Sequence, residues 1–417
     1  MQNSTEGQLQ IRFITKQEIY AVPDVPLSVP QAIDTSSLNA LINQLLKESN
    51  VDYLKPIEFD FLAIGELLRV PLINHLQERN VSTETTIDIE YLERTPAPEP
   101  KNSLLHDDWI CGIETLDKWV LTGCYDNSIN IWTTHGKLIK SSKEHKNMVK
   151  SVTWIDKSDA SKGFISVSHD LTALVWSFQP GTDNVTPKAV LRGHERGIDS
   201  VGVSPNALRI ATGGWDTNLK LWTTSLEEEA NEPAHKKSRN NNSVITKTPI
   251  STLKGHKETI SDINWIDNYV VSTISMDHTI KFWDAELCGI KNEIVGQKAY
   301  LSSSWSPLSN ALLASSADRH IRLYDPRSTE GSLCKTTFTS HTLWVSSVTW
   351  STYDEHLFLS GGYDSAVKMW DTRSPKAPLY NLQGHEGQVL KVDWSNRKYM
   401  VSGGSDNSVH IFKNKHI

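Results

Sequence analysis

Histidine, serine or threonine, and aspartate recur together along this chain, which is the combination that serine hydrolases use for nucleophilic catalysis. One such set is His194, Thr212 and Asp216, and Trp222 follows six residues after the aspartate. In an enzyme, the aspartate would orient the histidine, and the histidine would take the proton of the hydroxyl group. A catalytic set occurs once in an enzyme domain, whereas this set recurs along the chain. We therefore interpret the sets as structural.

The repeated unit contains an aspartate and an aromatic residue six positions later. The seven pairs are Asp126/Trp132, Asp170/Trp176, Asp216/Trp222, Asp277/Trp283, Asp318/Tyr324, Asp364/Trp370 and Asp406/Phe412. Six units open with a histidine: His106, His145, His194, His256, His341 and His385. Repetition at this period predicts a repeat architecture. The copies resemble the WD-repeat family, which implies a mainly β fold, a seven-bladed β-propeller of four-stranded sheets.

Each polar set is expected to form one buried hydrogen-bonded chain, which stabilises a blade only when every member is bonded. The predicted structural tetrads are His194, Thr212, Asp216 and Trp222; His256, Thr273, Asp277 and Trp283; and His341, Ser360, Asp364 and Trp370. The fifth unit has Gln297, Ala314 and Tyr324 at these positions. We therefore expect packing alone to hold the fifth blade.

The last blade lacks an outer strand of its own, because only five residues follow Phe412. We expect the linker, residues 95–105, to supply that strand and close the ring formed by residues 106–417. Residues 224–247 are charged and poor in apolar groups, which predicts a disordered insertion. Its Lys236-Lys237-Ser238-Arg239 run is either part of a solvated loop or an import or RNA-contacting patch.

Composition excludes several classes of protein. The chain has 417 residues and a formal charge of −7. No apolar run approaches the ~20 residues that span a bilayer, and the N-terminus has no signal-peptide pattern, so no membrane contact is expected. The cysteines have no metal-binding spacing, and no phosphate-binding loop is present. We expect no enzyme activity, no small-molecule substrate and no cofactor of the chain's own.

Residues 9–94 lie outside the repeats and are predicted to form a small α+β domain, after a disordered stretch over residues 1–8. The expected elements are strands over 9–14 and 19–22, a helix over 38–46 capped by Ser36 or Ser37, a hairpin around Gly65, a short helix over 71–77 and a strand over 86–92. This order is typical of a ubiquitin-like β-grasp.

Three phrases of this domain resemble the region before the propeller in Notchless-type ribosome-assembly factors: RFITKQEIYAVPDVPLSVP, FDFLAIGELLRVPLINHL and VSTETTIDIEYLE. In that family the domain binds the metal-ion-dependent adhesion-type domain of midasin, a giant AAA ATPase. A glutamate of the family completes the coordination of a divalent cation, expected to be Mg²⁺, which midasin holds. The matching residue here is Glu84, and Glu78 is the nearest competitor.

One face of such a propeller is lined by the residue before each turn aspartate and by the third residue after each opening position. Large aromatic side chains gather at these positions, as they do in protein-binding hot spots. The candidate partner-binding residues are Trp109, Tyr125, Trp215, Tyr300, Trp344 and Tyr363. Ordinary packing near the central channel is the alternative.

The seven repeats, the insertion in the third unit and the N-terminal domain together are most similar to the WD-repeat protein 12 family. This resemblance implies a non-catalytic factor for large (60S) subunit assembly and pre-rRNA processing in the nucleolus and nucleoplasm. The implied partners are homologues of pescadillo and block-of-proliferation, the pre-60S particle, and midasin, which removes the factor. The alternatives are a Notchless-like factor, a ubiquitin-ligase substrate receptor and an RNA-binding platform, the last disfavoured by the negative charge.

Overall fold

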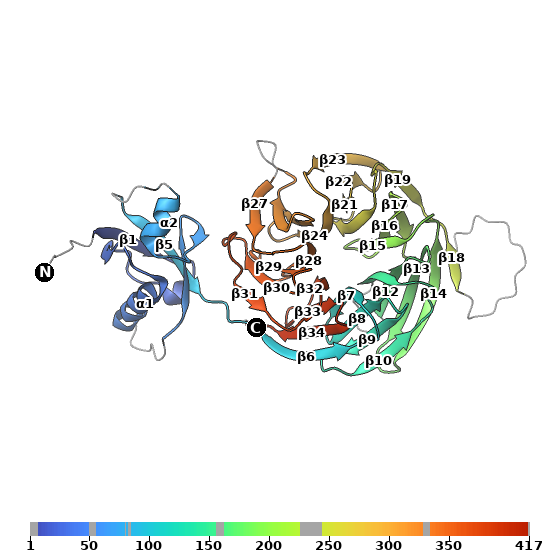
Figure 1. Cartoon of the computed structure of the whole chain (residues 1–417), viewed down its shortest axis with the longest axis horizontal. Helices are drawn as coiled ribbons and strands as arrows, with labels where there is room; N and C mark the ends of the chain where they lie inside the picture. Colours follow the sequence, from blue (N-terminus) through green and yellow to red (C-terminus); the bar gives the residue numbers. More distant parts are fainter. Residues whose placement is uncertain are drawn as a thin grey trace, which may run out of the picture. The chain divides into compact units, whose positions relative to one another are not determined.

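The computed structural model describes residues 7–49, 56–79, 81, 85–155, 162–225, 244–327 and 334–415. The chain divides into two compact units, Met1–Pro96 and Ala97–Lys415 (Figure 1). Each unit has hydrophobic core clusters of its own. Among the described residues, no helix is long and apolar enough to cross a bilayer.

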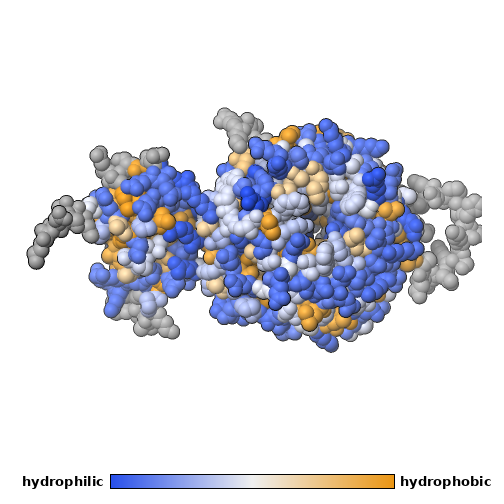
Figure 2. Space-filling model, in the orientation of Figure 1, coloured by the Kyte–Doolittle hydropathy of each residue, from blue (hydrophilic) through white to orange (hydrophobic). Residues whose placement is uncertain are grey.

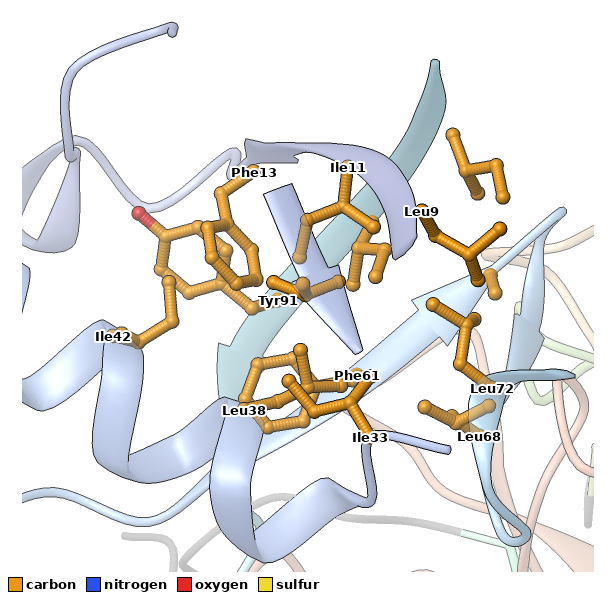
Figure 3. Packing of buried hydrophobic residues seen from close by; sticks show 14 of the residues in the cluster. Leu9, Ile11, Phe13, Ile33, Leu38, Ile42, Phe61, Leu68, Leu72 and Tyr91 are labelled. Carbon is orange, nitrogen blue, oxygen red and sulfur yellow. The ribbon is translucent and has the colours of Figure 1, made fainter. Parts of the chain in front are cut away.

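The N-terminal unit is a mixed five-stranded sheet packed against a long helix. Its elements are β1 (Gln8–Ile14), the 3-10 helix η1 (Glu18–Tyr20), β2 (Leu27–Pro30), α1 (Thr35–Ser49), β3 (Phe59–Ala63), β4 (Glu66–Leu67), α2 (Leu72–Glu78) and β5 (Ile87–Glu93). The strand order is β2-β1-β5-β3-β4, with β1 and β5 parallel. Leu38 and Ile42 of α1 share one core with Phe61 and Tyr91 of the sheet (Figure 3). This is the predicted β-grasp.

Three local predictions in this unit are wrong. The strand expected over 19–22 is η1, because Val22 N–H and Tyr20 C=O bond the Tyr91 hydroxyl, at 3.2 and 2.6 Å, in place of a neighbouring strand. The cap of α1 is Asp34, whose Oδ1 accepts the Ser37 N–H at 2.8 Å. The disordered stretch predicted over residues 1–8 extends too far, because Gln8 already pairs with Pro30 in the sheet.

The second unit is a ring of seven sheets, the blades (Figure 1), which confirms the predicted propeller. Blades one to three contain β7 (Ile110–Leu116), β8 (Trp119–Cys124), β9 (Ile129–Thr133) and β10 (Leu138–Ser142); β11 (Val149–Trp154), β12 (Lys162–Ser168), β13 (Thr172–Gln179) and β14 (Asn184–Arg192); and β15 (Ile198–Val203), β16 (Arg209–Gly214), β17 (Asn218–Thr223) and β19 (Ser251–Lys254).

Blades four to seven continue the ring in chain order. They contain β20 (Ile260–Trp265), β21 (Val270–Ser275), β22 (Thr279–Asp284) and β23 (Gly289–Val295); β24 (Tyr300–Ser306), β25 (Ala311–Ser316), β26 (His320–Tyr324) and β27 (Cys334–Thr339); β28 (Val345–Trp350), β29 (Leu357–Gly362), β30 (Val367–Asp371) and β31 (Tyr380–Leu382); and β32 (Val389–Asp393), β33 (Tyr399–Gly404) and β34 (Ser408–Lys413). The first strand of each blade lines the centre of the ring.

The ring is closed by β6 (Glu99–Leu105), which is the fourth strand of blade seven. β6 runs antiparallel to β34, from Glu99 opposite Lys413 to Leu105 opposite Ser408. Leu104 of β6 is 2 % exposed and packs in a core with residues of β7 and β34. This pairing confirms the closure predicted for residues 95–105. Without β6, the outer edge of β34 would be left unpaired.

The insertion predicted to be disordered over residues 224–247 has ordered ends, which corrects that boundary. Thr224 N–H donates to Leu208 C=O at 3.1 Å. Strand β18 (Ile245–Lys247) pairs in parallel with β14, with Ala189 opposite Ile245. Blade two therefore has a fifth strand, which the chain supplies on its way back to blade three. The basic run over 236–239 lies outside the described residues.

Candidate functional site

The predicted tetrad of blade three forms one continuous hydrogen-bonded chain. Trp222 Nε1–H donates to Thr212 Oγ1 at 2.8 Å, and His194 Nε2 lies 2.7 Å from the same oxygen. His194 Nδ1 lies 2.8 Å from Asp216 Oδ2, and because a carboxylate only accepts, Nδ1 carries the proton. Nε2 therefore accepts a hydrogen bond from the hydroxyl group of Thr212.

The same arrangement recurs in blades two, four and six. The distance from the histidine Nδ1 to the aspartate is 2.8 Å in blades two and four and 3.0 Å in blade six. All four histidine side chains are at most 1 % exposed. Every polar atom of the set is bonded inside its blade, so the sets are staples that hold the strands of each blade together.

The aspartates of these staples are held ionised. Burial alone would raise the pKa of Asp277, but the Thr279 hydroxyl, the Lys257 N–H and His256 donate to it and lower that pKa to about 2. Burial also opposes ionisation of Asp364, and the bonds from His341 and from backbone N–H groups lower its pKa to about 2. Burial likewise lowers the pKa of His256, which favours the neutral imidazole that the staple needs.

These pKa shifts predict loss of stability in acid. A carboxyl group with a folded-state pKa of about 2 and an ordinary unfolded pKa stabilises the fold fully above about pH 4 and loses that contribution as pH falls toward 2. Asp277→Asn should therefore lower the melting temperature at pH 7 and flatten its decline between pH 4 and pH 2.5, measured by circular dichroism. The exposed Asp183→Asn is the control, and an equal effect of both substitutions would contradict the prediction.

Blade five is not held by packing alone, which corrects the sequence prediction. The Tyr300 and Tyr324 hydroxyl groups hydrogen-bond to each other at 2.8 Å. Arg322 donates to Ser316 Oγ at 2.7 Å and to Asp318 Oδ1 at 3.2 Å. Two tyrosines and an arginine thus replace the missing histidine, hydroxyl residue and tryptophan. Because Tyr300 is 1 % exposed, it belongs to this internal network, and its prediction as a partner-binding residue is wrong.

The other five predicted rim residues, together with His169, form three aromatic pairs, which we call the rim pairs. The rings of Trp109 and Tyr125 are stacked with centroids 5.4 Å apart, and those of Trp344 and Tyr363 lie 5.9 Å apart. The ring of Trp215 contacts His169 at 5.2 Å. The three tryptophans are 42 %, 49 % and 50 % exposed, in the order Trp109, Trp344 and Trp215.

Trp215 is also fixed by a hydrogen bond. Its Nε1–H donates to Asp199 Oδ2 at 2.7 Å, and His169 Nε2 bonds the other carboxylate oxygen at 2.6 Å. The exposed indole is therefore rigid, and a rigid aromatic surface loses little conformational entropy when a partner covers it. This network is what a preorganised binding surface needs.

Three members of the rim pairs, Trp109, Tyr125 and Tyr363, line a cavity of about 210 Å³ together with Met276 and other residues from several blades. Figure 2 shows one face of the propeller, which is largely hydrophilic, carries separate apolar patches and is hollowed at its centre. A second cavity of about 290 Å³ is lined by other inner-strand residues, including Glu114, Trp265 and Asp393.

Sequence reasoning missed a second series of tryptophans. They lie five residues after the first residue of the inner strand in five blades: Trp154, Trp265, Trp305, Trp350 and Trp394. Four of them are at most 8 % exposed. Their fixed offset from the inner strand's first residue is a periodic signal that could have identified them as core residues. Together with the five tryptophans at the closing position of the repeat, they account for ten of the fourteen tryptophans in the chain.

Glu84 lies outside the described residues, so its assignment stays a prediction. The described residues on either side of it belong to the fold of the N-terminal unit. Val81 N–H donates to Leu76 C=O at 3.1 Å at the end of α2, and β5 begins at Ile87. Glu84 therefore lies in the chain between α2 and β5, the middle strand of the sheet.

Both units match known families. Residues 9–76 match the NLE (NUC135) domain family. Six segments match the WD domain, G-beta repeat family: residues 99–133, 185–223, 247–284, 293–325, 332–371 and 376–413. The first three strands of blade two lie outside these segments, and the structure shows that they complete the ring.

Curated relatives match almost the whole chain. A protein from Aedes aegypti is 48 % identical over 99 % of this chain and 96 % of its own length. Proteins from Culex quinquefasciatus and Anopheles gambiae are 48 % and 46 % identical, over 98 % and 99 % of this chain and 96 % of their own lengths. All three are named ribosome biogenesis protein WDR12 homologue. With an NLE domain, seven WD-type blades and this full-length identity, the chain belongs to the WDR12 family.

Proposed function

We propose that this chain is a non-catalytic assembly factor of the large (60S) ribosomal subunit, active in the nucleolus and nucleoplasm, where pre-rRNA is processed. The observation that carries the proposal is the combination of an NLE-type β-grasp and a closed propeller in one chain, aligned over nearly the full length of relatives named as ribosome biogenesis proteins. The bonding of the tetrads within their blades supports a scaffold role and not catalysis.

The propeller is proposed to bind pre-ribosomal proteins, namely the homologues of pescadillo and block-of-proliferation. The rim pairs support this assignment, because exposed and rigid aromatic groups at the centre of a surface are typical anchors of protein interfaces. Trp344 and Trp109 are nearly half exposed, yet the ring of each contacts a tyrosine ring of its own blade. A partner that covers them gains apolar burial without having to order the side chains.

The N-terminal unit is proposed to bind the adhesion-type domain of midasin. Glu84 would provide a carboxylate oxygen to the divalent cation that midasin holds, since hard cations such as Mg²⁺ prefer oxygen ligands. Midasin would then use ATP hydrolysis to pull the factor off the particle. In this mechanism the propeller holds the particle, the N-terminal unit is the handle, and no residue of the chain performs covalent chemistry.

Affinity purification of the tagged chain from cell nuclei tests the proposal. Large-subunit precursor proteins and the homologues of pescadillo and block-of-proliferation should co-purify in comparable amounts, and the tagged chain should concentrate in the nucleolus. Recovery of a cullin adaptor in their place would instead identify a ubiquitin-ligase receptor. RNA binding by the isolated chain that falls steeply with salt would indicate direct contact with rRNA.

Substituting the rim pair of blade six should weaken the propeller's partners without unfolding the ring. Trp344→Ala and Tyr363→Ala are each expected to cost about 2 kcal/mol of binding free energy, roughly a 30-fold loss, as hot-spot truncations do. Binding of the purified partner complex can be measured by biolayer interferometry. Leu287→Ala, at an 83 % exposed residue of blade four, is the matched surface control. A melting temperature that falls together with the affinity would show that the pair only packs.

A further inference from the structure

Blade seven departs from the other blades at two positions of one strand. Phe412 takes the place of the closing tryptophan, and His410 lies two residues before it. Blades three, four and six carry a lysine at the position of His410: Lys220, Lys281 and Lys368. Blade seven otherwise keeps its staple: His385 Nδ1 lies 2.9 and 3.1 Å from the carboxylate oxygens of Asp406.

His410 lies beside this staple. Its imidazole stands at 90° to that of His385, with ring centroids 4.4 Å apart. His410 Nε2 also bonds Ser408 Oγ at 3.1 Å, and that hydroxyl donates to Asp406 Oδ1 at 2.8 Å. Blade seven thus brings two histidines and one carboxylate together. His385 comes from the loop before β32, Asp406 from the turn before β34, and His410 from β34 itself.

The space that His410 fills is the space of the missing indole. A glycine precedes the opening histidine in blades three and four. A Cβ atom added to Gly193 of blade three would lie 3.4 Å from Cη2 of the closing tryptophan, and one added to Gly255 of blade four would lie 2.8 Å from it. In blade seven a Cβ on Gly384 would instead lie 3.2 Å from the ring of His410. An indole presents carbon atoms at this place, whereas the imidazole brings nitrogen atoms that can bind a metal.

The three side chains can each contribute one ligand atom, and these atoms lie within 4.8 Å of one another. Around a tetrahedral zinc ion with bonds of about 2.1 Å, ligand atoms lie about 3.4 Å apart. Displacements of about 1 Å would therefore bring the set to bonding distance. The Asp406 side chain is 15 % exposed, which gives an ion an approach from solvent.

We propose that His385, Asp406 and His410 form a binding site for Zn²⁺ or a similar divalent transition-metal ion, with water in the remaining position. Two imidazole nitrogens and one carboxylate oxygen suit Zn²⁺ and do not suit Mg²⁺ or Ca²⁺, which take oxygen ligands. The metal would replace the proton that His385 Nδ1 shares with Asp406. It would link the loop before β32 to β34, the strand on which β6 closes the ring.

Zinc titration of the full chain tests this proposal. The untagged protein is stripped with a chelator, and ZnCl₂ is added while binding heat and melting temperature are recorded. One ion per chain should bind and raise the melting temperature, because a ligand that binds only the folded state stabilises it. Co²⁺ should give the visible absorption of a four-coordinate site.

His410→Lys is the decisive variant, since three other blades carry lysine at this position and the fold without metal should be kept. It should weaken zinc binding at least roughly tenfold, as even the loss of an outer-shell partner does. His135→Lys, at an exposed histidine, should leave binding unchanged. If His410→Lys does not fold, His410→Gln replaces it. Equal zinc isotherms for wild type and the folded variant, or no binding by wild type, would show that His410 only fills the space of the indole.

Discussion

Replacing Glu84 with alanine is expected to abolish binding of the chain to the adhesion-type domain of midasin while the association with pre-ribosomal proteins is kept. The carboxylate would occupy an open position of a divalent cation, and alanine offers no oxygen in its place. Truncating one partner of a buried charge pair costs about 2–5 kcal/mol, which is roughly a 30- to 4,000-fold loss of affinity. Binding of the two purified proteins in Mg²⁺ measures this loss.

Two controls make the Glu84 experiment specific. Glu78→Ala, in α2 and at the competing acid, should leave the affinity unchanged. Chelation of Mg²⁺ should reduce wild-type binding to the level of Glu84→Ala and should not reduce the variant further. The assignment fails if Glu84→Ala binds as tightly as the wild type, or if wild-type binding is independent of the metal.

Removing β6 is expected to destabilise the whole propeller. A chain that lacks residues 1–105 loses the backbone ladder between β6 and β34 and the buried side chain of Leu104. It also loses the bond from Asn102 Nδ2 to Thr134 C=O at 3.0 Å, which ties β6 to blade one. Lost burial alone costs about 2–5 kcal/mol for one leucine, and the unpaired edge of β34 adds to it.

A second truncation separates the closure from the N-terminal unit. A chain that lacks only residues 1–94 keeps β6 and should melt at the temperature of the propeller in the full chain. The chain that lacks residues 1–105 should melt well below it or aggregate. Differential scanning calorimetry compares the two, and coinciding transitions would refute a role of β6 in stability.

The repeats made most of the propeller predictable. Each aspartate, hydroxyl residue and histidine is constrained by a bond within its own blade, and several in-phase copies repeat the same signal. The closing strand could be inferred because the segment before His106 was expected to pair with the last repeat, as β6 does. The network inside blade five could not be predicted from the repeat. There the hydroxyl groups of Tyr300 and Tyr324 bond to each other in place of the tetrad, and this pair does not recur in the other blades.

The remaining errors concern contacts between distant segments. The segment around Tyr20 has the alternation of a strand, but its backbone bonds the hydroxyl of Tyr91, about 70 residues later. The three residues of β18 are too short for a periodic pattern, and their partner strand β14 lies more than 50 residues earlier, in the preceding repeat. Exposure was also beyond sequence reasoning, because Trp344 and Tyr300 were both expected at the third position after the opening residue and only Trp344 faces solvent.

The closing strand has a mechanical consequence. Thr95–Pro98 joins the N-terminal unit directly to β6, so tension on that unit enters the ring at Glu99. Glu99 pairs with Lys413, at the far end of the ladder from Leu105. A pull directed away from the blade therefore loads the hydrogen-bonded residue pairs of β6 and β34 one after another. Pairs that break in turn yield at a lower force than pairs that share the load. The N-terminal unit, which we propose as the handle, is therefore attached to the strand whose release from β34 would open the ring.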